Sequence, residues 1–322
     1  MQVKNNLILL LVLLFFAGCT ENLVNYNDEL VYDTAYEDEA AHDNTVYAST
    51  PLMWHVTSPD GQTMYLFGSI HAATKDLYPL PKYVMDAFHS SDYLAVEFNT
   101  LSPDADAMIS TIINIHGIYH DGRTIADDLG IELYLKASTF LAKHDLAGFE
   151  MFRPFIWNDL LSGVIVEEAG LSFEHGLDIF FINGAEHLGM EILEIESALS
   201  QMRMLADMST PLQVALIAET LENIDLAVQE LKELYYQWKQ GDMQALQEML
   251  FHQGLIYEDE LFAEYWDAMM TQRDIHMAEM ARSYMAEGKN VFFVVGLAHF
   301  LTEDGGIIDL LEQNGYDVVR VQ

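Results

Sequence analysis

Two apolar runs near opposite ends of the chain each lead into a Gly-x-x-His sequence, and this pairing restricts the possible folds more than any other feature. The first run ends at Phe67 and continues as Gly68-Ser69-Ile70-His71. The second spans Val291 to Val295 and continues as Gly296-Leu297-Ala298-His299. Short apolar runs of this kind are typical of strands that are buried on both faces. The pattern predicts a sheet built from both ends of the chain and covered by helices.

The other segments complete an α/β arrangement. Additional strands are expected at 52–57, 63–67, 93–98, 190–195 and 316–321, with a hairpin around Pro59-Asp60-Gly61 joining the first two. Helices are expected at 81–91, 211–239, 242–251, 258–286 (as one helix or two) and 306–313. We therefore expect a mixed or parallel central sheet from the N- and C-terminal segments, covered by helices, with a large helical insert between them over about 102–288.

The N-terminal residues have the pattern of a secretion signal that ends in a lipid attachment site. Lys4 gives the start a positive charge, and Leu7 to Phe16 form an apolar run that is too short to span a bilayer as a mature helix. Ala17-Gly18-Cys19 follows, and small residues directly before a cysteine resemble a bacterial lipobox. The resemblance implies cleavage before Cys19 and lipidation of its thiol. An ordinary signal peptide with a chance cysteine is the alternative.

These features predict how the chain is organised and where it resides. We expect a lipoprotein signal peptide in residues 1–18, an acidic disordered tether in 19–49 and a folded domain in 50–322. Thr20, rather than Asp, follows the cysteine, and resemblance to sorted lipoproteins then implies the outer membrane. The protein is expected at the cell envelope, attached to the membrane by its lipid.

The charge balance excludes one class of partner. The chain has 51 Asp and Glu residues against 14 Lys and Arg, a formal net charge of -37. Nucleic acid and anionic membrane surfaces both require a basic face, so neither is expected as a partner. The acidity is typical of a solvated surface, and an acidic cleft that attracts cations or basic peptides is the sharper interpretation. A single cysteine excludes an intramolecular disulfide.

Three side chains of ligand type follow three apolar strands. His71 and His299 end the two Gly-x-x-His sequences, and Glu97 ends the run Tyr93 to Val96. In open α/β sheets, ligands bind at the carboxyl ends of the strands. Two imidazoles and a carboxylate can hold a divalent metal that lowers the pKa of water and polarises a carbonyl, as amide hydrolysis requires. One Gly-x-x-His alone is a weak signal, because a histidine in such a sequence usually has only a structural role. A functional site becomes the better interpretation because the motif occurs twice and a third ligand-type residue also follows a strand.

The order of the motifs along the chain resembles the TraB/GumN family. The resemblance extends from about Met53 to Arg320, nearly the whole folded domain. The matching segments are Trp54-His55-Val56, Tyr65 to His71, Leu80-Pro81, Ser91 to Glu97, Arg153-Pro154-Phe155, Gly176-Leu177-Asp178, Leu193 to Gln201, Arg273, Val295 to Phe300 and Gly315 to Val318. The family includes the animal Tiki proteins, which are described as metal-dependent proteases.

The resemblance implies a metal-dependent peptidase or hydrolase with a fold like those of EreA, ChaN and Tiki. It implies a divalent transition metal (Mn, Co or Zn) held by His71, His299 and Glu97, and a peptide or protein substrate. Glu97, Glu196 and Arg273 are the catalytic candidates, with Glu97 as ligand or general base and Arg273 as the group that stabilises an oxyanion. ChaN-like relatives suggest the alternative, a haem- or metal-ligand-binding lipoprotein without catalysis.

Several residues leave two interpretations open. Asp274 stands where the family usually has Asn, and it could repel a substrate anion or pair with Arg273. Asp178 is equally consistent with the first turn of a helix and with the site. Glu196 is a site residue or a solvated, helix-capping one. Ser69 lacks the Gly-x-Ser-x-Gly setting, which disfavours a serine hydrolase.

Overall fold

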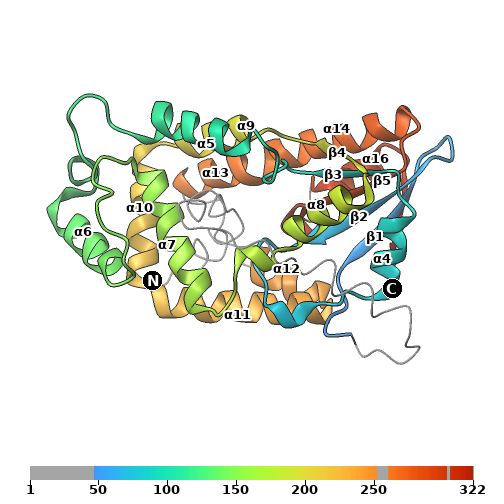
Figure 1. Ribbon diagram of the computed structural model, residues 1–322, viewed down its shortest axis with the longest axis horizontal. Coiled ribbons are helices and arrows are strands. Elements are labelled where there is room, and N and C mark those ends of the chain that lie inside the picture. Colours follow the sequence, from blue (N-terminus) through green and yellow to red (C-terminus); the bar gives the residue numbers. More distant parts are fainter. Residues whose placement is uncertain (1–46, 252–259, 303–304, 322) are drawn as a thin grey trace.

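The sheet draws its strands from both ends of the chain. The computed structural model describes residues 47–251, 260–302 and 305–321 (Figure 1). Six strands form one sheet in the order β4-β3-β5-β2-β1-β6. Their bounds are Met53–Thr57 (β1), Thr63–Ser69 (β2), Tyr93–Val96 (β3), Glu191–Glu194 (β4), Val291–Gly296 (β5) and Asp317–Val321 (β6).

The sheet is mixed, and its four site-bearing strands are parallel neighbours. β5 pairs in parallel with β2 on one side and with β3 on the other, and β4 pairs in parallel with β3. Ser69 at the end of β2 lies opposite Gly296 at the end of β5. β1 alone runs antiparallel to both of its neighbours, β2 and β6. The carboxyl ends of β4, β3, β5 and β2 therefore lie along one edge.

The predicted hairpin joins the two N-terminal strands. Ser58 accepts from the backbone N–H of Gly61, whose φ of 84° is in the left-handed region that favours glycine. This turn sets the register that places Thr57 opposite Thr63. The sequence signal of Asp-Gly between apolar runs is confirmed here.

Helices cover the sheet and form a long extension beside it, on the left in Figure 1. Their bounds are Lys82–His89 (α4), Ala105–Ile112 (α5), Ile125–Ala142 (α6), Pro154–Glu168 (α7), Leu177–Leu188 (α8), Ala198–Asp207 (α9), Thr210–Glu222 (α10), Ile224–Gln240 (α11), Met243–Phe251 (α12), Glu260–Trp266 (α13), Gln272–Ala286 (α14), Ala298–Leu301 (α15) and Ile307–Gln313 (α16). Short 3-10 helices span Lys75–Leu77 and Phe173–His175, and π-helical turns span Ile113–Gly117 and Asp267–Thr271.

The central strand β5 explains why the sheet needs two helical layers. All six of its residues are buried, as expected of an apolar strand that is covered on both faces. On one face, the ring of Phe292 packs edge-on or tilted against Phe88 of α4 and Phe181 of α8, with ring centroids 4.9–5.5 Å apart. These aromatic contacts fix α4 and α8 against the sheet.

A second hydrophobic core lies in the helical extension. Its buried members include Ile125 of α6, Trp157 of α7 and Ile217 of α10. α7 begins with Pro154 in its first turn, where a missing N–H costs nothing, and buries most of its residues. The predicted helical insert is thus confirmed as a body with its own packed interior beside the sheet.

Two predicted helical regions differ from a single straight helix. The segment 211–239 divides at Asn223, which ends α10 and precedes α11, and whose side-chain amide donates to the carbonyl of Glu219. The segment 258–286 runs from α13 into α14 through the π-helical turn Asp267–Thr271. Such turns occur often at functional sites because they redirect side chains.

The start of the described chain packs on α11. Ser49 is buried, and the backbone N–H of Thr50 donates to the carbonyl of Lys239. The predicted signal peptide with Cys19, and most of the predicted tether, lie outside the described residues. Within the described part of the chain, none of the helices has both the length and the apolar character to cross a membrane.

Candidate functional site

The parallel strand ends bring the predicted site residues together. His71 follows β2, Glu97 follows β3, and His299 follows β5 within the short helix α15. Glu196 follows the edge strand β4. Residues separated by more than half of the chain thus meet at one edge because their strands are parallel and share a register.

Gly296 is the point around which three of these side chains gather. A Cβ atom at Gly296 would lie 3.5 Å from Oε1 of Glu97, 3.6 Å from Nε2 of His71 and 3.7 Å from Cδ2 of His299. The backbone N–H of Gly296 donates to Oε1 of Glu97 over 2.9 Å. The absence of a side chain at this position therefore leaves a space that all three groups border.

His71 is oriented by a carboxylate behind it. Its Nδ1 lies 2.8 Å from Oδ2 of Asp178, in the first turn of α8. Because an ionised carboxylate only accepts hydrogen bonds, Nδ1 carries the proton and Nε2 faces Gly296. The hydroxyl of Ser69 donates to the other oxygen of Asp178 over 3.0 Å and so fixes that carboxylate. Asp178 therefore has both roles that the sequence allows.

His299 has the same arrangement, built from a different helix. Its Nδ1 lies 2.5 Å from Oδ1 of Asp274 on α14, and both residues are buried. Asp274 thus neither pairs with Arg273, as one interpretation expected, nor faces the cavity as an isolated charge. It fixes the ring of His299. Burial raises the pKa of Asp274, against the opposing effects of His299 and Arg273.

Glu97 and Glu196 share one guanidinium. Nη2 of Arg273 donates to Oε2 of Glu97 over 2.6 Å and to Oε2 of Glu196 over 2.8 Å. Nε of Arg273 donates to Oε1 of Glu196 over 3.0 Å. The side-chain amide of Gln201 bridges the two carboxylates, 3.0 Å from Oε2 of Glu97 and 2.6 Å from Oε2 of Glu196. This buried group of two acids, one base and one amide is rigid because each member is held by at least two others.

The charges around the site shift two pKa values in opposite directions. Burial opposes the charged form of His71, but the nearby Asp178 and Glu97 outweigh it and raise the pKa of His71 to about 9. Burial also opposes ionisation of Glu97, but Arg273, His71 and His299 outweigh it and hold the pKa of Glu97 far below its usual value. Since a metal ligand must be a neutral imidazole, a cation at His71 would displace a proton.

The glycines of the two motifs allow close packing around the histidines. Neither Gly68 nor Gly296 has a positive φ. A Cβ at Gly68 would lie 2.3 Å from Cδ1 of Leu297, so the first motif packs directly on the second. A Cβ at Gly176, just before α8, would lie 2.2 Å from the carbonyl oxygen of His71. These contacts let the loops around both histidines approach each other.

The order and spacing of these residues match a known family. The profile of the TraB/PrgY/gumN family matches residues 52–320 of the chain. The chain belongs to this family. Among curated proteins, the "Uncharacterized protein YbaP" of Escherichia coli (strain K12) is 22% identical over 258 residues, covering 77% of this chain and 88% of that protein. The protein of the same name from Shigella flexneri matches to the same extent. No solved structure matches the chain.

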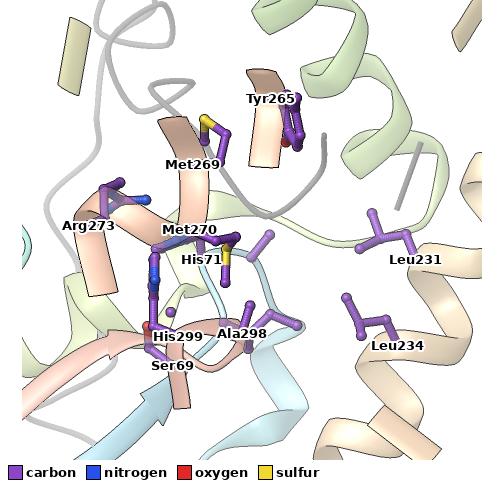
Figure 2. A pocket seen from close by; sticks show the side chains of 13 residues that line it. Ser69, His71, Leu231, Leu234, Tyr265, Met269, Met270, Arg273, Ala298 and His299 are labelled. Carbon is purple, nitrogen blue, oxygen red and sulfur yellow. The ribbon is translucent and has the colours of Figure 1, made fainter. Parts of the chain in front are cut away.

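A cavity opens beside the two histidines in this TraB-family fold. Its empty volume is about 570 Å³ including the mouth. Figure 2 shows His71, His299 and Arg273 on one side and Leu231 and Leu234 of α11 opposite them. The helical insert supplies the rest of the wall, with Tyr265 from α13 and Met269 and Met270 from the π-helical turn.

The donor set fits a metal ion in its chemistry. Both imidazoles bind a carboxylate through Nδ1, the usual arrangement of histidine at metal sites, and Nε2 of His71 borders the space beside Gly296. Glu97 is the third predicted ligand, but its two oxygens already accept from Gly296, Gln201 and Arg273. Within residues 47–251, 260–302 and 305–321, no cluster of three or more His, Cys, Asp or Glu side chains has the spacing of a metal site.

Sequence reasoning missed several residues of the site. Gln201 was noted only for its motif position, and Asp274 was expected to repel a substrate anion or to pair with Arg273. Each holds a predicted site residue in place instead. Tyr265, Met269 and Met270 had no sequence signal, because a helical segment does not reveal a π-helical turn before it is folded. The hydroxyl of Ser69 donates to Asp178, and its exclusion as a hydrolase nucleophile stays a prediction.

Proposed function

We propose that this TraB-family member is a metal-dependent hydrolase that cleaves peptide bonds. The observation that carries the proposal is the pair of carboxylate-backed imidazoles beside Gly296, next to an apolar cavity and a buried arginine. His71 and His299 would hold a divalent cation such as Mn, Co or Zn, with Glu97 as the third protein ligand. Such a cation polarises a substrate carbonyl and lowers the pKa of water when it is bound.

The surrounding residues have roles that do not depend on which metal is used. Asp178 and Asp274 each bind Nδ1 of one ring, which leaves Nε2 of that ring as the nitrogen that a cation would use. Glu97 remains ionised over the whole physiological range because its pKa is so low. A base with such a low pKa accepts protons poorly, which favours Glu97 as a ligand over Glu97 as general base.

Arg273 is the candidate for stabilising developing negative charge. It lines the cavity, is 4% exposed and keeps Nη1 without a hydrogen-bond partner within the described residues. A fixed donor in a water-poor wall stabilises an oxyanion more strongly than the same donor in water does. Glu196 and Gln201 act through Arg273 and Glu97 by holding them in place.

The location of the protein is part of the proposal. A lipid on Cys19 would hold the domain at the cell envelope, outside the cytoplasm, where the substrate would be a peptide or exposed protein segment. The support is the lipobox-like Ala17-Gly18-Cys19 after an apolar run. Labelled fatty acid should appear on the wild-type chain and not on Cys19→Ser, and label on the variant would contradict this attachment site.

The test of the reaction combines metal content with cleavage. The full chain is purified without chelator, its bound metals are measured by mass spectrometry, and its activity is measured on a mixed peptide library. We expect about one divalent ion per chain, and we expect His71→Ala and His299→Ala to lose both metal and cleavage while keeping their circular dichroism spectra. Glu97→Gln distinguishes a ligand from a base, because loss of metal indicates the former and loss of cleavage alone indicates the latter.

The same experiment decides between hydrolysis and the alternative of a haem- or metal-binding lipoprotein. The apolar wall opposite two histidines would also accept a flat iron-containing ligand. A chain that retains haem or metal but cleaves no member of the library, with or without added Mn, Co or Zn, would refute the hydrolase and support the binding protein. A chain that binds neither would refute both.

A further inference from the structure

A second cavity adjoins the one at the histidines. It lies in the helical insert between α7 and α10, and its space is about 440 Å³ when the open mouth is included. Tyr265 and Met269 line both cavities, so the two share a wall made by α13 and the π-helical turn. The first cavity, at the histidines, and this second cavity thus lie one after the other along the same helical segment.

Each cavity has one buried polar side chain with an unused hydrogen-bonding atom. In the first cavity, Nη1 of Arg273 has no partner, and in the second, Oδ1 of Asn158 has none among the described residues. Asn158 is 9% exposed, and its Nδ2 donates to the carbonyl of Gln213 over 3.0 Å, which fixes the orientation of the amide. Leaving such an atom unpaired in a buried place costs about 1–3 kcal/mol.

The two unused atoms differ in kind. Nη1 of Arg273 is a donor that matches a carbonyl oxygen, and Oδ1 of Asn158 is an acceptor that matches an N–H. A polypeptide backbone supplies one acceptor and one donor for every residue. The remaining lining is largely apolar, with Leu231 and Leu234 in the first cavity and Leu216 in the second. Such walls accept apolar side chains and disfavour sugars, whose hydroxyl groups would lose water without finding partners.

We infer that the two cavities form one binding channel for an extended peptide with two large apolar side chains. One side chain occupies the first cavity beside the histidines, and its backbone carbonyl accepts from Arg273. The second side chain passes the wall of Tyr265 and Met269 into the second cavity, where a backbone N–H donates to Asn158. The channel specifies the class of substrate for the proposed hydrolase. Only the cleavage of the bound peptide rests on that proposed function.

One experiment measures the binding and the cleavage of peptides separately. The full chain is incubated with an equimolar mixture of end-blocked hexapeptides, and mass spectrometry identifies both the retained peptides and the products. We expect retained peptides to carry two large apolar residues at a fixed spacing, each enriched about tenfold over alanine, in keeping with the burial of one such side chain. A wild-type chain that retains no peptide, or retains peptides without this pairing, would overturn the channel.

Variants that fill one cavity show which cavity binds which apolar side chain of the peptide. Ser162→Leu on α7 and Leu216→Trp on α10 each add bulk in the second cavity, and Leu231→Ala enlarges the first. We expect either filling variant to lose the preference for the side chain in the second cavity and to keep the preference for the side chain in the first. Leu231→Ala should shift the preference of the first cavity towards larger side chains. Two filling variants on different helices protect the test against one that does not fold. Unchanged preferences in a folded filling variant would refute the second subsite.

The role of Asn158 has its own probe. A retained peptide is synthesised with an N-methyl group at each position in turn, which removes one N–H at a time. We expect one position to weaken binding to the wild type about tenfold and to leave binding to Asn158→Leu unchanged. Equal losses in both proteins would place the N–H elsewhere. Binding without cleavage would refute the proposed hydrolase and leave the peptide channel in place. Cleavage with unchanged side-chain preferences in the filling variants would refute the channel and leave the hydrolase in place.

Discussion

Gly296→Ala should leave the stability of the fold nearly unchanged and weaken metal binding at the site. A methyl group at this position would contact Glu97, His71 and His299 at 3.5–3.7 Å, which are ordinary van der Waals distances. No atom has to move, and the backbone does not have a positive φ. The methyl group would nevertheless fill the space that the three side chains border, with the volume of about one coordinated water.

The magnitudes follow from these contacts. Replacing glycine by alanine in a compatible strand conformation changes the free energy of unfolding by at most about 1 kcal/mol, so the melting temperature should stay within about 4 °C of the wild type. The metal affinity should fall at least about tenfold, or about 1.4 kcal/mol, because a ligand position is blocked. Calorimetric unfolding and isothermal titration with Mn²⁺ or Zn²⁺ measure the two quantities.

Gly176→Ala is the matched control. Its added Cβ would lie 2.2 Å from the carbonyl oxygen of His71, a backbone atom that cannot rotate away. We expect a loss of about 3 kcal/mol or more and a melting temperature at least about 6 °C lower. If Gly296→Ala unfolds like Gly176→Ala, the geometry around Gly296 is wrong. If it binds metal as the wild type does, the space between the three side chains is not the site.

Three further predictions follow from the charges. Burial raises the pKa of Glu230 to about 6, so the contribution of Glu230 to stability is largest below pH 4.5 and is lost as the pH rises through 6. In thermal melts, Glu230→Gln should therefore stabilise the protein by about 1 kcal/mol at pH 7.5, after allowing for solvent screening, and should have no effect at pH 4. Asp274→Asn should keep the fold but weaken metal binding at His299 about tenfold by titration, since the amide is a weaker acceptor for Nδ1. Arg273→Met leaves Glu97 buried without its cation and should cost about 3–5 kcal/mol in urea unfolding, with part of the loss recovered as the pH falls; an unchanged denaturation midpoint would contradict the buried network.

The sequence predicts the edge of the sheet well because its signals there are local. An apolar run followed by His71, Glu97 or His299 carries both the strand and the residue that leaves it, and parallel pairing then brings the three together. The strand bounds, the hairpin at Gly61 and the helical insert follow from the same period and turn rules.

The partners of these residues could not be predicted from the same rules. Asp178 has a sufficient local explanation in the first turn of α8, and Asp274 looks like any acidic residue on a helix. Their bonds to His71 and His299 depend on how α8 and α14 pack across the sheet, which no periodicity encodes. The cavity wall is similar, because Met269 and Met270 face it through a π-helical turn that appears only in the folded chain.

The place of β5 in the sheet makes the site depend on a strand that is synthesised late. β5 lies between β3 and β2, yet it is made after the whole helical insert. A growing chain that has reached α14 already contains His71, Glu97 and Arg273, but the two halves of its sheet have no strand to join them. Because β2 and β3 each pair with β5 and not with each other, β5 is the strand that brings His71 and Glu97 to one edge. A chain that ends before β5 therefore cannot assemble the site, although the other three strands that lead to it are already made.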